Sequence, residues 1–423
     1  MSAPHAHASL ATWLDYLENL HPNQIDLGLE RIRTVALKLN LIGPQAQPLA
    51  HKVISVAGTN GKGSSLAYLE QLSLQAGIKV GTYTSPHFLR YNERIRVQGQ
   101  EVSDTEIVQA FARIEAARGH TSLTYFEFGT LAACLIFQQS ALDIALLEVG
   151  LGGRLDAVNL IDADIAVVTS IALDHADWLG TDLQEIAYAK VGIARAHRPL
   201  VLGSESMPER IFQCAQDLHT PVYQLGKEFI QTSNGETWQW SNTQGKCFTQ
   251  LPYPKLPYPN AATSLQAFLL TGYPITQAQI QAAVAQAQLT GRLQRHGPWL
   301  LDVAHNPHAA SYIAQHLKTK TRRLAILGMM SDKDQAGVVK ALTPYIQAWI
   351  TTDLPLARAA SAQTLAHIVQ AQGGRVLAQV TDPQSAYQKA HAQLKIQAFD
   401  EVLVLGSFFT LAGLLADVLA STD

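Results

Sequence analysis

A glycine-rich loop at residues 58–64 constrains this chain more than any other stretch of its sequence. The apolar, β-branched run 53–56 before it predicts a buried strand, and the leucines of residues 65–76 after it have helical spacing. A strand, a glycine loop and a helix in that order are the setting that a phosphate-binding loop requires. Glycines allow backbone N–H groups to turn toward an anion, Lys62 can reach a terminal phosphate, and Ser64 offers a hydroxyl to Mg²⁺. The loop therefore predicts a phosphate-binding site.

The spacing of this loop is shorter than the G-x-x-x-x-G-K-[ST] pattern of the common P-loop by one or two residues. A glycine-rich turn between two packed elements, with no ligand, would have a similar sequence. Phosphate binding is the favoured interpretation, with such a turn as the alternative.

Composition excludes several classes of protein. The formal net charge of −3 and the absence of a basic stripe argue against a nucleic-acid partner. The most apolar stretch, 131–147, is interrupted by polar residues and predicts no membrane span. No lysine or arginine precedes Arg31, so a secretory n-region is not expected. The three cysteines form no C-x-x-C pair and suit a reducing compartment. We expect a cytoplasmic α/β protein.

Polar side chains with possible site roles follow two further predicted strands. Glu148 lies near the end of the strand 143–149 and precedes a run of glycines, so its carboxylate should face an open crevice. A Mg²⁺-associated acid occupies this place in nucleotide-hydrolysing enzymes. His175 follows the strand 165–170 and stands between two aspartates. A structural role and a site role are about equally well supported for this histidine.

The sequence pattern indicates two domains. Alternating runs on either side of Asn234–Gly235 indicate a β-hairpin, part of a small meander that decorates the first domain's sheet. Thr290–Gly291–Arg292 is the best linker candidate, which gives domains of residues 1–289 and 290–423. The second domain should alternate strands and helices, with strands at 299–303, 324–328, 348–352, 376–380 and 402–405. The expected fold is α/β: a P-loop ATPase-like domain with a mainly parallel sheet and the meander, then a Rossmann-like βαβ domain.

Four motifs in this order resemble the folylpolyglutamate synthase/dihydrofolate synthase family, a branch of the Mur ligase superfamily. They are the glycine loop, Ser85–Pro86–His87, the stretch from Glu148 to Asp156, and Asp302–Val303–Ala304–His305–Asn306–Pro307. The match extends from about Trp13 to the final strand, and the short glycine loop is similar to this family's own version. The resemblance implies a ligase in which ATP phosphorylates a substrate carboxylate. The amine of glutamate then attacks the resulting acyl phosphate.

The resemblance also implies roles for single residues. The implied nucleotide contacts are Thr59, Asn60, Gly61, Lys62, Gly63, Ser64, Asn260, Arg292 and Asp302. One Mg²⁺ is expected on Ser85 and a second on Glu148 and His175, although histidine is an atypical ligand for this cation. Lys190, on a predicted helix 182–194, matches a lysine that is carbamylated in the family, with an ordinary surface lysine as the alternative. Asn260 is equally expected to cap a helix over 261–270. The expected catalytic residues are Lys62, Lys190 and His305, the last of which would help to place glutamate.

Three stretches bear on which acceptor the chain uses. Asp26–Leu27–Gly28–Leu29 resembles the dihydropteroate-binding loop of bifunctional bacterial enzymes, and Tyr125–Phe126–Glu127–Phe128 resembles its companion. Gly153, Arg154 and Leu155 complete the implied pterin site. Aromatic side chains suit stacking on a flat ring, although phenylalanines at helical spacing also serve a core. The resemblance therefore implies addition of glutamate both to 7,8-dihydropteroate and to reduced folates. ATP, L-glutamate and these pterins are the expected partners of a monomeric enzyme.

Other interpretations remain open at this point. A Mur ligase of peptidoglycan precursors usually needs an additional N-terminal UDP-binding domain, and only about fifty residues precede the glycine loop. A folylpolyglutamate synthase with that activity alone is a further alternative. A P-loop kinase or nucleotide-binding regulator would not need the second βαβ domain with Asp302 and His305.

Overall fold

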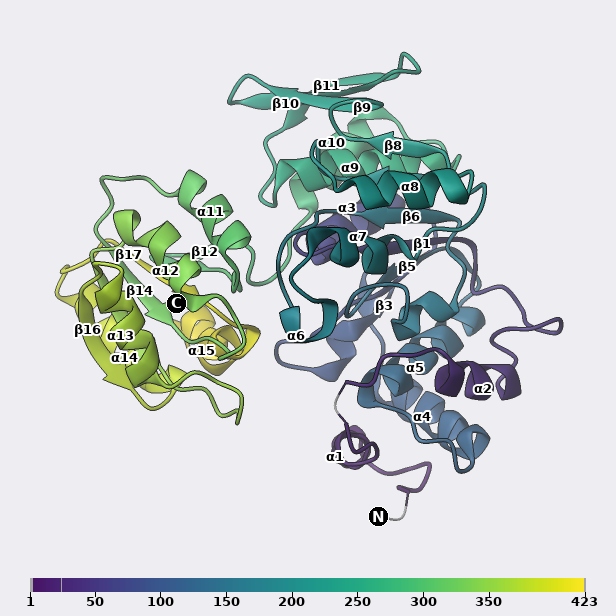
Figure 1. The fold of residues 1–423 in the computed structure, drawn as a ribbon, viewed down its shortest axis with the longest axis horizontal. Coiled ribbons are helices and arrows are strands. Elements are labelled where there is room, and N and C mark those ends of the chain that lie inside the picture. Colours follow the sequence, from purple (N-terminus) through teal and green to yellow (C-terminus); the bar gives the residue numbers. More distant parts are fainter. Residues whose placement is uncertain (1–2, 24, 422–423) are drawn as a thin grey trace. The chain divides into compact units, whose positions relative to one another are not determined.

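The strand and helix expected around the glycine loop are β1 (Ala50–Ala57) and α3 (Lys62–Gln75) in a computed structural model that describes residues 3–23 and 25–421. The chain divides into two compact units. The first unit comprises residues 1–171 and 181–288, and the second comprises 172–180 and 289–423. Figure 1 shows the elements of both units, each of which is described below by itself.

A sheet in the order β4-β3-β2-β5-β1-β6-β7-β8 forms the first unit. From β2 to β8 the neighbouring strands are parallel, while β3 and β4 form an antiparallel edge hairpin that the sequence analysis did not anticipate. The further strands of this sheet are β2 (Val80–Tyr83), β3 (Ile95–Val97), β4 (Gln100–Glu101), β5 (Leu142–Glu148), β6 (Ile165–Val168), β7 (Leu200–Leu202) and β8 (Val222–Gln224).

Helices cover both faces of this sheet. Helix α3 packs with α9 and α10 on one face, and α4 and α5 pack on the other together with α1 (Figure 1). Helix α5 is buried from Glu127 to Phe137, because it lies between the strands β2 and β5 and the helices α1, α2 and α4. The helices of this unit are α1 (Leu10–Glu18), α2 (Glu30–Lys38), α4 (Asp104–Arg118), α5 (Tyr125–Gln139), α7 (Leu183–Val191), α8 (Glu209–Asp217), α9 (Tyr258–Leu270) and α10 (Gln277–Gln286), with short 3₁₀ turns at Tyr91–Arg94 and Ala157–Leu160.

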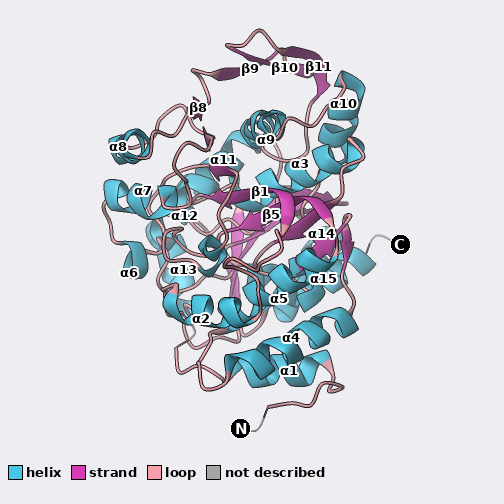
Figure 2. Cartoon of the chain, turned by 90° about the vertical axis from the view of Figure 1, so that its right-hand side faces the viewer, coloured by secondary structure: helices cyan, strands magenta, loops and turns pink. Residues whose placement is uncertain are grey.

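The predicted meander is a separate three-stranded antiparallel sheet rather than an extension of the main one. Its strands are β9 (Phe229–Ser233), β10 (Thr237–Asn242) and β11 (Cys247–Pro252), and Asn234 and Gly235 form the expected tight turn. Trp238 and Trp240, both on β10, are fully buried. Figure 2 shows this sheet at the end of the first unit, beside α9 and α10.

The second unit has a sheet in the order β12-β13-β17-β14-β15-β16, parallel except for the first pair. Helices α11, α12 and α13 cover one face, and α14 and α15 cover the other. The expected doubly covered βαβ arrangement is confirmed, with β12 as an unanticipated edge strand. The elements are α6 (Ala176–Leu179), β12 (Gln294–His296), β13 (Trp299–Leu301), α11 (Pro307–His316), β14 (Arg323–Leu327), α12 (Gln335–Leu342), a 3₁₀ turn at Thr343–Tyr345, β15 (Ala348–Thr352), α13 (Ala362–Ala371), β16 (Val376–Val380), α14 (Pro383–Lys395), β17 (Glu401–Leu405) and α15 (Phe408–Ala420).

Candidate active site

The glycine loop leaves β1 at its carboxyl end and turns directly into α3. Gly61 has a φ of +91° and is the N-cap of a helix that starts at Lys62, three residues earlier than the sequence analysis expected. The first-turn N–H groups of α3 therefore face the loop, as anion binding requires. The Lys62 ammonium folds back over the loop and donates to the carbonyl oxygen of Gly58 at 3.0 Å.

The end of β6 fixes the shape of the loop. The backbone N–H of Thr59 donates to Ser170 O at 2.8 Å, and that of Asn60 donates to Ser170 Oγ at 3.0 Å. The Thr169 hydroxyl donates to Asn60 O at 2.7 Å. Only glycine fits at position 58, because a Cβ there would lie 1.8 Å from Thr169 Oγ1. Adjacent parallel strands thus hold the loop at their carboxyl ends, where open α/β sheets place their ligands.

Asn260 lies against the glycine loop. A Cβ at Gly61 would lie 2.9 Å from both Asn260 Nδ2 and Oδ1, so the amide is in van der Waals contact with the loop. The expectation that Asn260 caps a helix is wrong, since α9 starts at Tyr258 with Pro257 as its N-cap. Pro259 in the first turn extends the helix N-terminally, because its fixed φ suits that position. The Asn260 side chain is thereby left for the loop.

Glu148 and Ser85 lie together at the ends of β5 and β2. The buried Glu148 carboxylate accepts the backbone N–H of Ser85 through Oε2 at 3.0 Å. Carboxylate and hydroxyl oxygens are suitable ligands for Mg²⁺. His175 belongs to the second unit, where it has a left-handed backbone conformation with a φ of +53°. Among the described residues, no group of three or more His, Cys, Asp and Glu side chains could hold a metal ion.

Lys190 is buried, with 5% of its surface exposed, so the alternative of an ordinary surface lysine is wrong. It lies on α7, whose backbone packs against the glycines that follow Glu148. A Cβ at Gly153 would lie within 3.1 Å of Ala189 and Lys190 backbone atoms. Lysines are rarely buried in proteins because the charge is costly to remove from water. The burial of Lys190 therefore sets it apart from the chain's surface lysines.

Asp156 organises the loop that follows Glu148. Its carboxylate accepts the backbone N–H of Leu151 at 2.8 Å and that of Val158 at 3.0 Å. Burial raises the pKa of Asp156 to about 6, although backbone N–H groups and the charge of Lys62 oppose this rise. The loop from Gly150 to Asp156 is thus a rigid turn.

The three stretches expected to bind a pterin come together in the first unit. The Gly28 N–H donates to Leu155 O at 3.1 Å. The Arg31 guanidinium joins the first of these stretches to the 125–128 stretch, with Nη1 2.9 Å from Asp26 Oδ2 and Nη2 3.3 Å from Glu127 Oε1. Asp26, Leu27, Gly28 and Leu29 are all partly exposed. This region therefore joins three segments that are far apart in sequence.

The aromatic residues of the 125–128 stretch differ in accessibility. Phe126 is partly exposed and its ring covers Gly150, where a Cβ would lie 2.7 Å from Cζ. Tyr125 is also partly exposed. Phe128 is fully buried, 5.4 Å from the Phe111 ring centroid, so the expectation that it contacts a pterin is wrong. Its position one helical turn after Thr124 directs it into the core.

Arg94 also belongs to this region. Its guanidinium is buried over the rings of Tyr91 and Tyr125, at 5.3 and 5.6 Å from their centroids, and Nε donates to His87 Nδ1 at 2.8 Å. Burial lowers the pKa of His87 to about 4, and the Arg94 charge adds to this effect. The Arg94 guanidinium is therefore buried among aromatic rings rather than solvated.

In the second unit, Asp302 fixes the start of the domain. Its buried carboxylate accepts the N–H of Leu293 and that of Ala304, both at 2.8 Å. Burial raises the pKa of Asp302, and the charge of Arg292 opposes this rise. The Arg292 guanidinium lies 5.2 Å from the Phe408 ring centroid. Asp302 and Arg292 thus lie close together, Arg292 before β12 and Asp302 after β13.

Asp174 anchors residues 172–180 within the second unit. Its carboxylate lies 2.5 Å from Lys333 Nζ and 3.3 Å from His305 Nε2, and it accepts Asn306 Nδ2 at 3.2 Å. Burial alone would raise the pKa of Asp174, but the His305 hydrogen bond and the charge of Lys333 hold it well below its usual range. Lys333 was not anticipated, although it follows β14 much as His305 follows β13.

This geometry agrees with known protein families. The Mur ligase middle domain matches residues 56–228, and the Mur ligase glutamate ligase domain matches residues 290–408. The fold and these matches define the chain as a Mur-type ligase. The expected α/β fold class is confirmed.

Individual relatives give a closer assignment. The dihydrofolate synthase/folylpolyglutamate synthase of Escherichia coli is 45% identical over 97% of this chain and 95% of that protein, and that of Haemophilus influenzae is 39% identical over 96% and 97%. The solved E. coli enzyme in complex with DHPP and ADP has a TM-score of 0.93 and 43% identity, with both chains fully covered. A solved bifunctional folylpolyglutamate synthase/dihydrofolate synthase with Mn, AMPPNP and L-glutamate bound has a TM-score of 0.88 and 42% identity, over 99% of this chain and 100% of that one.

The chain belongs to the dihydrofolate synthase/folylpolyglutamate synthase family of Mur ligases. The family resemblance expected from the four motifs is confirmed. Within residues 3–23 and 25–421, no helix has the length and apolar character needed to cross a membrane.

Proposed function

We propose that this chain adds L-glutamate to 7,8-dihydropteroate to form dihydrofolate, and to reduced folates to form polyglutamates. A carboxylate oxygen of the acceptor attacks the γ-phosphate of ATP, which gives an acyl phosphate and ADP. The glutamate amine then attacks the acyl carbon, the amide forms, and inorganic phosphate and a proton leave. Phosphorylation is needed because a carboxylate is a poor electrophile.

One observation carries this proposal: the glycine loop, the Glu148–Ser85 pair and the segment 153–155 follow the adjacent strands β1, β5 and β2 at their carboxyl ends, and the other two expected pterin segments contact the loop after β5. A phosphate donor and a flat acceptor both need such an edge. The names and bound ligands of the relatives support the same chemistry. The two units would correspond to an ATP- and pterin-binding domain and a glutamate ligase domain, as the sequence boundaries 1–289 and 290–423 suggest.

The nucleotide would bind at the start of α3. The backbone N–H groups of the loop would hold the phosphates, and Lys62 would turn from Gly58 O toward the γ-phosphate. Contact between Asn260 and Gly61 supports a role for that amide beside the nucleotide. The remaining proposed contacts are Thr59, Asn60, Gly61, Gly63, Ser64, Arg292 and Asp302.

Two Mg²⁺ ions are proposed, one on Ser85 and one on Glu148 and His175. The contact between Glu148 and Ser85 fits oxygen coordination of this cation. Bound Mg²⁺ would neutralise phosphate charge during transfer. Lys190 is proposed to carry a carbamate, formed when its neutral amine attacks CO₂ and a proton is released. The buried position of Lys190 supports this, because the modified side chain would offer oxygen ligands instead of a buried ammonium.

The acceptor would lie among Asp26, Leu27, Gly28, Leu29, Tyr125, Phe126, Glu127, Gly153, Arg154 and Leu155. The partly exposed rings of Tyr125 and Phe126 suit stacking on a flat ring system. His305 is proposed to help place glutamate. We further propose a cytoplasmic monomer that uses small molecules alone as partners.

Purified protein tests the activity directly. ATP, Mg²⁺ and L-glutamate are supplied with dihydropteroate or with tetrahydrofolate, and both ADP release and the glutamylated product are measured. Glutamate-dependent ADP release with both acceptors is the expected result, whereas a kinase would release ADP without glutamate. Product from tetrahydrofolate alone would indicate a folylpolyglutamate synthase with a single activity. Absence of ADP and product with both acceptors would refute the proposal.

A further inference from the structure

Two arginines share one aromatic ring beside the proposed acceptor site. The Arg154 guanidinium carbon lies 4.0 Å from the centroid of the Tyr188 ring, and that of Arg210 lies 4.8 Å from the same centroid. The three residues come from the loop after β5, from α7 and from α8, all within the first unit. Since both cations lie over one ring, their guanidinium carbons are at most about 9 Å apart.

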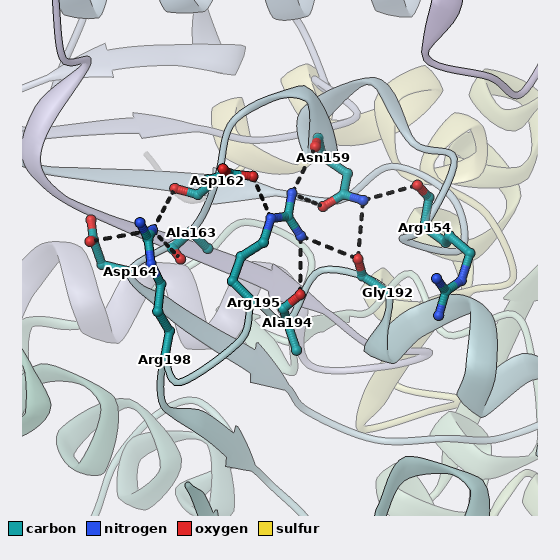
Figure 3. Close-up of polar contacts among 9 residues, drawn as sticks. All are labelled: Arg154, Asn159, Asp162, Ala163, Asp164, Gly192, Ala194, Arg195 and Arg198. Atoms are coloured by element: carbon teal, nitrogen blue, oxygen red, sulfur yellow. Dashed lines mark hydrogen bonds and ion pairs between the residues drawn. The ribbon is translucent and has the colours of Figure 1, made fainter. Parts of the chain in front are cut away.

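The arginines nearby show how a structural arginine is used in this fold. Arg195 bonds to the side chains of Asp162 and Asn159 and to the carbonyl oxygens of Asn159, Gly192 and Ala194 (Figure 3). Arg198 similarly reaches Ala163 O at 2.8 Å and Asp164 Oδ1 at 3.5 Å (Figure 3). Both use their donors on carboxylates and carbonyls that hold the loop before β6.

Arg154 and Arg210 differ from these structural arginines. In Figure 3 the Arg154 side chain extends away from Asn159. The contact between the two residues is a hydrogen bond from Asn159 Nδ2 to the backbone oxygen of Arg154. Its guanidinium makes one long hydrogen bond, from Nη2 to Tyr188 O at 3.5 Å. The Arg210 guanidinium makes one hydrogen bond at 3.3 Å, from Nη1 to Gln213 Oε1. Within the described part of the chain, neither guanidinium forms an ion pair and neither Nε has a hydrogen-bond partner. Each guanidinium therefore retains most of its five N–H donors.

Arg154 is itself one of the residues proposed to hold the acceptor, and the pair lies next to the others. The backbone N–H of Arg154 donates to the carbonyl oxygen of Ala189, the residue before Lys190, at 2.8 Å. Leu155, which follows Arg154, accepts the N–H of Gly28 at 3.1 Å through its carbonyl oxygen. Two half-buried cations that repel one another create a positive potential at this point. A carboxylate bound between them would relieve the repulsion and use the remaining donors.

We propose that Arg154, Tyr188 and Arg210 form a subsite for the α-carboxylates of a γ-glutamyl tail on the folate acceptor. The inference rests on the proposed function. In dihydropteroate the only carboxylate is the one that reacts, so this acceptor has no group for the subsite. A glutamylated folate reacts through its terminal γ-carboxylate and carries at least one further α-carboxylate. The subsite therefore favours acceptors that already carry glutamate.

The test is Arg210→Gln, which removes one cation of the pair without altering Arg154. KM values are measured for dihydropteroate, for tetrahydropteroyl mono- and diglutamate, for L-glutamate and for ATP. We expect the ratio of KM for the diglutamate to KM for dihydropteroate to rise about fivefold or more. Arg210→Lys keeps the charge and should recover part of the ratio. Lys227→Gln is the matched control, because Lys227 lies 5.2 Å from the ring centroid of Phe212, also on α8, and its loss should leave every KM unchanged.

Other outcomes overturn the inference. A lower melting temperature for Arg210→Gln with an unchanged KM ratio would show that the stack only packs α7 against α8. A rise in KM for L-glutamate with both acceptors would assign the subsite to the incoming amino acid, and a rise for ATP would assign it to phosphate. Failure of the proposed function is distinguishable from all of these, since the unmodified protein would then form no glutamylated product.

Discussion

Replacement of Gly58 by alanine tests whether the end of β6 determines the shape of the nucleotide loop. Gly58 has a φ of +151°, and its added Cβ would lie 1.8 Å from Thr169 Oγ1 and 3.1 Å from Thr169 Cβ. That hydroxyl donates to Asn60 O at 2.7 Å, so the group that must move is the one that holds the loop. The backbone beyond it cannot retreat easily, because Thr169 N donates to Ala57 O at 2.9 Å.

The magnitude follows from these contacts. An unfavourable backbone conformation costs about 1–3 kcal/mol, and loss of the hydroxyl bond costs about 1 kcal/mol more. We therefore expect Gly58→Ala to lower the free energy of unfolding of the first unit by about 2–4 kcal/mol. Distortion of the loop should also weaken ATP binding about tenfold or more, equivalent to about 1.4 kcal/mol.

Urea unfolding and calorimetric titration with ATP measure the two quantities. Gly77→Ala is the matched control: Gly77 follows α3, has a φ of +74°, and an added Cβ would meet no atom within 4 Å. It should cost about 1–2 kcal/mol of stability and leave ATP affinity unchanged. The reasoning is refuted if the two variants lose equal stability, or if Gly58→Ala binds ATP as tightly as the parent.

Three further predictions concern the same unit. Lys62→Ala should reduce turnover to background while the melting temperature stays within a few degrees, because the side chain loses a single hydrogen bond among the described residues, the one to Gly58 O. Turnover near the parent's would remove Lys62 from the mechanism. Asp26→Asn should weaken the contact with Arg31 and raise KM for dihydropteroate more than KM for tetrahydrofolate, whereas equal rises would contradict the assignment of that loop. Because the pKa of Asp156 is raised, its carboxyl group holds a proton more tightly in the folded chain than in the unfolded chain. The contribution of Asp156 to the free energy of unfolding is therefore greatest below about pH 4 and declines until about pH 6. The stability difference between the parent and Asp156→Asn, followed by urea unfolding, should therefore fall by roughly 3 kcal/mol across that window, and a flat difference would show that Asp156 titrates normally.

The sequence predicted the elements whose signals are local. The strand before the glycine loop is β1, and the tight turn at Asn234–Gly235 joins β9 to β10, both as expected. The parallel strands of both units were recognisable from apolar runs that alternate with helices. The β12 edge and the separation of the meander from the main sheet were not, because pairing between short strands depends on tertiary packing.

Prediction of the site was limited by contacts between distant segments. That Asn260 touches Gly61 follows from the packing of α9 on α3, which no local pattern encodes. Burial of Lys190 and of Phe128 depends likewise on which face of a helix meets the sheet. Lys333 was missed for a different reason. An isolated charge is usually solvated, and only the buried carboxylate of Asp174 distinguishes this lysine.

The attachment of residues 172–180 to the second unit makes that unit discontinuous in sequence. A gene fragment that starts at Leu289 would encode Lys333, His305 and Asn306 but not Asp174, the carboxylate they share. Of its ion pairs within the described part of the chain, Lys333 would keep the longer one with Asp332, at 3.7 Å. Removal of one partner from a buried ion pair costs about 3–5 kcal/mol. The smaller half of the protein is therefore not a module that can be excised or exchanged by cutting at the linker, because part of its interior is encoded within the other half.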